Sequence, residues 1–95
     1  MEKLSQDVVE QKLEEYSDWS LSGDSIQRTV SFESFQGAME FVNRIADLAE
    51  SLQHHPDIMI RYNKVTLTLS THDAGGLTER DFQFAREADA YSAAT

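Results

Sequence analysis

The only proline of the chain, Pro56, fixes where its longest helix must end. Proline lacks a backbone N–H and disfavours helical geometry at the residue before it. Upstream of it, apolar residues recur at three- and four-residue spacing from Phe35 to Leu52, and Ser34 is the predicted N-cap of this helix. The helix is therefore expected to end at His54-His55, with two imidazoles at its end facing a cleft.

The third histidine also lies at the end of a predicted element. Alternating apolar residues predict a strand over 65–71, and His72 follows where the pattern runs out into Asp73-Ala74-Gly75-Gly76. Histidine is the side chain whose charge changes near neutral pH. Three of them at element ends suggest proton transfer.

The remaining patterns give the other elements. A helix is predicted from the N-cap Ser5 to Tyr16, and a last helix begins after Thr78. Strands are predicted over 19–22, 26–32, 58–62 and 65–71, with turns at Gly23-Asp24 and Asn63-Lys64. The order α-β-β-α-β-β-α predicts an α+β fold, in which residues 1–95 form one domain with a single four-stranded antiparallel sheet and three helices on one face.

The last helix carries two further predictions. Asp81 stands three residues after Thr78, as in a capping box, so both a capping and a catalytic role are open to it. The helix also has two weak apolar rows, of which one is expected to face the sheet and the other a second subunit. The rows are Phe82 with Ala85, and Phe84 with Ala88 and Tyr91.

Composition excludes several classes of function. Seventeen acidic against eight basic residues give a net charge of −9, which argues against direct binding to nucleic acid or to an anionic membrane. Without cysteine the chain has neither a disulfide framework nor a thiolate metal site. No apolar run is long enough for a signal peptide or a membrane span, and a cytoplasmic location is expected.

A spaced set of residues resembles the signature of the pterin-4a-carbinolamine dehydratases. The set is Glu50, His54-His55-Pro56, Tyr62, His72 and Asp81. The flanking stretches 62–65 and 69–81 are similar to the family as well, and the resemblance covers nearly the whole chain. Gln53 and Ile58 depart from the pattern, since some members carry an acid and an aromatic residue there.

The resemblance implies the same α+β fold and the activity of a hydro-lyase. Family members dehydrate 4a-hydroxytetrahydrobiopterin, released by aromatic amino acid hydroxylases, to quinonoid dihydropterin and water, without cofactor or metal. It implies His54, His55 and His72 as catalytic residues, with Glu50 and Asp81 as accompanying carboxylates. We expect His54 and His72 to transfer protons on opposite sides of the pterin, and His55 to bind and orient it. Further substrate-binding or supporting positions are Pro56, Tyr62, Thr71 and Asp73, with Tyr62 in the sheet core or a pocket wall.

Other interpretations stay open at this point. Histidine pairs also occur as helix caps and in solvated loops, and three imidazoles with a carboxylate suffice for zinc, although adjacent histidines seldom converge on one ion. Some family members are also dimerisation cofactors of a homeodomain transcription factor, and a non-catalytic pterin-binding relative is a further alternative. The resemblance suggests a homodimer or a tetramer built as a dimer of dimers, through sheet edges and terminal helices.

Overall fold

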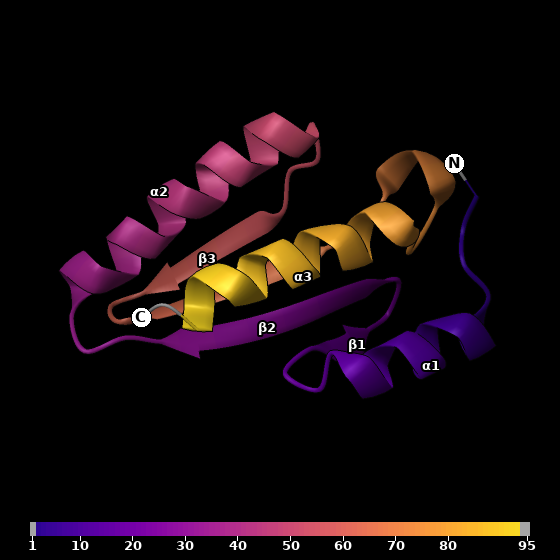
Figure 1. Cartoon of the computed structure of the whole chain (residues 1–95), viewed down its shortest axis with the longest axis horizontal. Helices are drawn as coiled ribbons and strands as arrows, with labels where there is room; N and C mark the ends of the chain where they lie inside the picture. The colour runs from indigo at the N-terminus through magenta and orange to yellow at the C-terminus, as the bar shows by residue number, and fades with distance from the viewer. Residues whose placement is uncertain (1, 94–95) are drawn as a thin grey trace.

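The computed structural model describes residues 2–93, and its elements follow the predicted order (Figure 1). The helices are α1 (Gln6–Glu15), α2 (Phe35–Leu52) and α3 (Glu79–Ala93). The strands are β1 (Ser20–Ser22), β2 (Ser25–Ser31), β3 (Asp57–Arg61) and β4 (Lys64–Leu69). A short 3-10 turn, η1 (His72–Ala74), follows β4.

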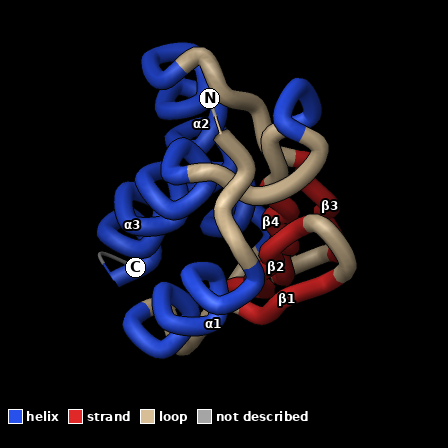
Figure 2. The backbone as a smooth tube through the Cα atoms, turned by 90° about the vertical axis from the view of Figure 1, so that its right-hand side faces the viewer, coloured by secondary structure: helices blue, strands red, loops and turns tan. Residues whose placement is uncertain are grey.

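The four strands form one antiparallel sheet in the order β1-β2-β4-β3. Figure 2 shows the helices gathered on one side of this sheet, with α1 near its β1 edge. The predicted α+β fold is thus confirmed. Within residues 2–93, none of the helices has both the length and the apolar character needed to span a membrane.

Local sequence signals set the helix starts. Ser5 Oγ accepts a hydrogen bond from the Val8 amide at 3.3 Å, and Ser34 Oγ accepts one from the Gly37 amide at 3.0 Å. Each hydroxyl satisfies one of the amide donors that a helix leaves unpaired in its first turn. Both predicted N-caps are confirmed.

The hydrophobic core lies between the sheet and the helices. One charged residue, Arg28, lies on the face of β2 that is turned toward this core. Arg28 points to the same side as the buried Ile26 and Val30. Its guanidinium is 2.5 Å from Asp89 of α3, and the same carboxylate oxygen accepts a hydrogen bond from Trp19 Nε1 at 2.8 Å. The pair therefore ties the second half of α3 to β2 and to the loop before β1.

Both apolar rows of α3 pack against the core of the chain, with Tyr91 half-buried and the other members buried, so the prediction that one row faces a second subunit is wrong. Phe82 and Phe84 are both buried. The Phe82 ring lies 5.6 Å from Tyr16 after α1, and the Phe84 ring lies 6.3 Å from the His54 ring after α2. Because α3 packs against residues at the ends of both other helices, neither row is left for a partner.

The turn between β3 and β4 lies one residue earlier than predicted. Arg61 pairs with Lys64, so the turn residues are Tyr62 and Asn63, not Asn63 and Lys64. Asn63 is held at the second turn position, since its backbone C=O and its Nδ2 both bond the backbone of Phe32, each at 2.8 Å. Tyr62 takes a positive φ of 53° and its side chain is 70% exposed, so it does not belong to the sheet core.

Candidate active site

The end of α2 fixes the backbone at His54. Gln53 adopts the left-handed conformation with φ 51°. The His54 amide bonds Ala49 O at 3.1 Å, and the Gln53 amide bonds Glu50 O at 3.4 Å. These two hydrogen bonds are those of a Schellman motif, which ends a helix and turns the chain away from its axis. The predicted helix end is confirmed, and His54 is the first residue past the turn.

The His54 imidazole meets a buried carboxylate of α3. His54 Nε2 lies 2.6 Å from Asp81 Oδ1, and Asp81 is completely buried while His54 is 8% exposed. The other oxygen, Asp81 Oδ2, accepts the Thr78 amide at 2.9 Å and the Thr71 hydroxyl at 2.8 Å. Asp81 therefore caps α3 with one oxygen and holds His54 with the other, which joins the two roles left open by the sequence.

This contact determines which ring nitrogen of His54 is available for chemistry. A carboxylate accepts hydrogen bonds, so Nε2 carries a proton, and in the neutral ring Nδ1 then carries the lone pair. Within residues 2–93, every buried side-chain nitrogen and oxygen has a hydrogen-bond partner. Among these residues no hydrogen-bond partner is found for His54 Nδ1, whose ring bonds Asp81 through Nε2. Nδ1 therefore reaches the surface and is the ring atom that can take a proton from a bound molecule.

His55 pairs with the other predicted carboxylate at the surface. His55 Nε2 lies 2.6 Å from Glu50 Oε2, and both side chains are exposed. Glu50 thus orients His55 and not His54, although His54 is the residue four positions after it. An exposed pair of this kind adds little stability, about 0 to 1 kcal/mol, so its effect is to orient the ring.

The third histidine is held next to the same carboxylate through its neighbour. Thr71, which bonds Asp81, immediately precedes His72 in η1. Two backbone hydrogen bonds between Thr71 and Gly76, at 2.9 and 3.3 Å, close the loop that carries His72 and Asp73, both exposed. The ring of His72 has no hydrogen-bond partner in the part of the chain that the structure describes. It is free to contact a ligand.

Two predicted positions lie outside this network. Pro56 is half-buried and lies between His55 and the first residue of β3. Tyr62 follows the far end of β3, and the six residue steps from Pro56 at about 3.3 Å each put it roughly 20 Å away. Within one chain the structure thus brings His54, Thr71 and Asp81 together and leaves Tyr62 apart.

Residues missed as site residues by the sequence analysis complete the network. The Thr78 hydroxyl lies 2.8 Å from the Thr71 hydroxyl, and the Phe84 ring stands edge-on to the His54 ring. The capping signal located Thr78 but gave no sign that its hydroxyl joins Thr71. No local signal could have found Phe84, because its contact depends on how α3 packs on the end of α2.

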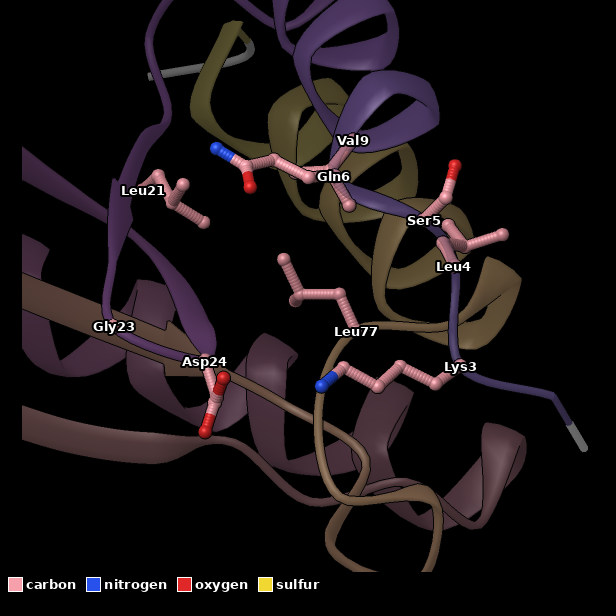
Figure 3. Close-up of a pocket in the computed structure, with 9 residues that line it drawn as sticks. All are labelled: Lys3, Leu4, Ser5, Gln6, Val9, Leu21, Gly23, Asp24 and Leu77. Carbon is pink, nitrogen blue, oxygen red and sulfur yellow. The ribbon is translucent and has the colours of Figure 1, made fainter.

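Besides the His54 network, a binding site among the described residues could take the form of a metal centre or a cavity. No group of three or more His, Asp or Glu side chains among residues 2–93 is arranged to hold a metal ion. A cavity of about 590 Å³ lies between the N-terminal segment, the β1–β2 turn and Leu77 (Figure 3). None of the predicted site residues lines it, so the catalytic candidates lie elsewhere.

Comparison with known proteins places this chain in a family. The model of the family described as pterin 4 alpha carbinolamine dehydratase matches residues 2–91. The chain belongs to that family. Among its relatives is the "Putative pterin-4-alpha-carbinolamine dehydratase" of Thermomicrobium roseum, which is 51% identical over 92% of this chain and 94% of its own length.

Solved structures agree with the family assignment. A crystal structure described as "transcriptional coactivator/pterin dehydratase" from Brucella melitensis matches with a TM-score of 0.90 and 34% identity, over 95% of this chain and 98% of its own. A "pterin dehydratase-like protein" described as a RuBisCO assembly factor in the alpha-carboxysome shares the fold, with a TM-score of 0.65 and 24% identity over 78% of this chain and 86% of its own. The dehydratase family therefore accounts for nearly the whole chain.

Proposed function

We propose that this chain is a hydro-lyase that dehydrates 4a-hydroxytetrahydrobiopterin to quinonoid dihydropterin and water. The observation that carries the proposal is the pairing of His54 Nε2 with the buried Asp81 carboxylate, which leaves Nδ1 as an oriented base. A carboxylate that fixes the tautomer of a histidine in this way is a recurrent arrangement in proton-transfer enzymes. Membership of the family supports the substrate class.

The reaction needs one base and one acid. His54 Nδ1 accepts the proton of pterin N5, and the N5 electron pair forms the C=N bond to C4a as the C4a–O bond breaks. His72, as an imidazolium, gives its proton to the departing hydroxyl, which leaves as water. The two histidines exchange protons with solvent after the product leaves. No oxidation state changes, so the proposed reaction takes no redox cofactor.

His55 is proposed to bind and orient the pterin. Its ring is held by Glu50 at the surface beside His54, so it presents a fixed polar edge to a ligand in that position. Ground-state binding of this kind changes KM more than kcat. His55→Ala is therefore expected to raise KM, in contrast to the losses in kcat expected at the two proton-transfer positions.

The experiment that tests the proposal measures the rate of 4a-hydroxytetrahydropterin dehydration from the absorbance of quinonoid dihydropterin as it appears. The parent protein is compared with His54→Ala and His72→Ala variants whose folding is checked by circular dichroism. Each is expected to lose about 10²- to 10⁴-fold in kcat, the usual contribution of a positioned acid or base. A parent rate equal to the spontaneous rate rejects the proposal, and an unchanged rate in one variant removes that histidine from the mechanism.

We further propose that the active form is a homo-oligomer in which β3 pairs with a second copy. β3 is an edge strand of five exposed residues, among them Ile58, Met59 and Ile60. An unpaired apolar edge is prone to association, and pairing with a second copy is one way of covering it. The other edge strand, β1, is shorter and carries serine on both sides of Leu21.

A role in protein binding is the second candidate. The helix-borne side chain Phe35, at the start of α2, is 48% exposed. The description of the relative from Brucella melitensis names both a transcriptional coactivator and a pterin dehydratase. A parent protein that binds a pterin but does not accelerate the dehydration of 4a-hydroxytetrahydropterin favours this role over catalysis.

A further inference from the structure

We propose that Arg80 is a positioning residue for His54, acting on the backbone that carries this histidine. Arg80 Nη2 donates to Leu52 O at 3.2 Å and also to Gln53 O. Neither carbonyl is used by the hydrogen bonds of the Schellman motif. The inference deepens the proposed function, on which it rests, by naming a residue that needs no contact with the substrate.

The carbonyls at the end of a helix need such a partner. The last four C=O groups of a helix lack intrahelical donors, and they carry the negative end of the helix dipole. A guanidinium is the side chain best suited to several acceptors at once, because it presents five N–H donors in a planar fork. Arg80 meets both needs at the C-terminal end of α2.

Arg80 holds a stretch of backbone in a sparsely populated conformation. Gln53 has a φ of 51°, and a non-glycine residue in the left-handed region carries a conformational penalty of about 1 to 2 kcal/mol. Gln53 Nε2 donates to Glu50 O at 2.8 Å, which supports the turn from one side. Arg80 supports it from α3. Removing the guanidinium leaves this left-handed turn without its contact to the neighbouring helix.

Arg80 and Asp81 act on the same residue from two directions. Asp81 binds the His54 imidazole, while its chain neighbour Arg80 binds the two carbonyls just before His54. The first turn of α3 thus fixes both the ring and the backbone of one histidine. Two anchors fix the direction of Nδ1, whereas a single contact at Nε2 leaves the ring free to pivot about it.

The test compares Arg80→Ala and Arg80→Lys with a matched control, Arg86→Ala. Arg86 is an exposed arginine of the same helix, so its loss changes the net charge equally without touching α2. The readouts are the 15N shifts of the His54 ring from long-range 1H–15N NMR of the substrate-free protein, and kcat and KM. The NMR readout needs no activity, so it separates failure of this inference from failure of the proposed function.

In the parent and in Arg86→Ala, the His54 signals are expected to show one tautomer with the proton on Nε2. In Arg80→Ala, the ring is expected to pivot about its Asp81 contact, so that the Nδ1 signal shifts and broadens while the proton stays on Nε2, with kcat lowered about tenfold and KM changed less than about twofold, as for a misplaced catalytic group. Arg80→Lys keeps a donor and is expected to recover part of kcat. If Arg80→Ala fails to fold, the lysine variant carries the comparison, with an intermediate kcat expected.

Two results overturn the inference. One is an unchanged Nδ1 signal and an unchanged kcat in Arg80→Ala. The other is an equal loss of kcat in Arg86→Ala, which assigns the effect to net charge alone.

Discussion

Asp81 Oδ1 lies 2.6 Å from His54 Nε2, while Oδ2 of the same carboxylate accepts the Thr78 amide at the start of α3. One buried group therefore begins a helix and orients a histidine. The position of the imidazole depends on the helix being formed and docked. The geometry of the proposed active site and the folding of the chain are coupled at this residue.

Substitution of Asp81 separates these two roles. Asp81→Asn keeps an oxygen for the Thr78 amide but removes the charge that orients His54, so kcat is expected to fall at least tenfold while the free energy of unfolding falls by about 1 kcal/mol. Asp81→Ala removes the cap and leaves Thr71 without its acceptor, and is expected to lose about 2 to 4 kcal/mol. Urea unfolding and the dehydratase assay measure both. An asparagine variant with the parent kcat contradicts the orienting role.

The Phe84 ring supports His54 from the core. Phe84 is completely buried, and Phe84→Ala is expected to reduce the free energy of unfolding by about 3 to 5 kcal/mol through lost burial and a cavity. Phe35→Ala is the control, because this ring is 48% exposed and its loss is expected to change stability by less than about 1 kcal/mol. Equal losses in urea unfolding speak against the packing described for α3.

At the left-handed residue at the end of α2, one substitution is expected to stabilise the protein, unlike the destabilising substitutions above. Gln53→Gly is expected to raise the free energy of unfolding by about 0.5 to 1 kcal/mol, because glycine adopts a φ of 51° without the steric penalty. Gln53→Val is expected to lower it by about 1 to 2 kcal/mol, since a β-branched residue tolerates this region least. Thermal unfolding of both variants is the measurement. A glycine variant less stable than the valine variant contradicts the Schellman geometry.

Asp89 compensates for the charge of Arg28 on the inner face of β2. Asp89→Ala removes the acceptor of both Arg28 and Trp19 Nε1 and is expected to lower the free energy of unfolding by about 2 to 4 kcal/mol. The matched control is Asp18→Ala, whose exposed carboxylate lies 3.6 Å from the same guanidinium and is expected to contribute less than about 1 kcal/mol. A larger loss at Asp18 reverses the assignment.

The proposed pairing of β3 is tested by charge. The double substitution Ile58→Lys and Ile60→Lys places like charges on the edge strand and is expected to reduce the mass in solution to that of a smaller assembly. Leu21→Lys places a single lysine on the opposite edge and is expected to leave the mass unaltered. Sedimentation of the three proteins measures this. A mass that falls only with Leu21→Lys moves the interface to β1.

Most of the fold could be predicted because its signals are local. Period-2 alternation in β4 and the 3.6-residue spacing in α2 each follow from one face being buried, and both patterns gave the right element. The β3–β4 turn was misplaced by one residue because its register is fixed by contacts between Asn63 and Phe32, which lie 31 residues apart. One row of α3 was misassigned to a second subunit because the cover of Phe82, Tyr16, comes from a distant helix end.

The sequence by itself determined the order of the elements of this protein and, to within about two residues, where they begin and end, and with them that its three histidines follow such ends. Caps, the proline and the apolar spacing act over a few residues, so they can be read from the chain. Only the tertiary structure decided that Asp81 meets His54 across 27 residues, that Glu50 meets His55, and that Arg80 reaches the end of α2. These contacts depend on the docking of α3 against α2, which burial of apolar side chains drives without specifying which polar groups will meet.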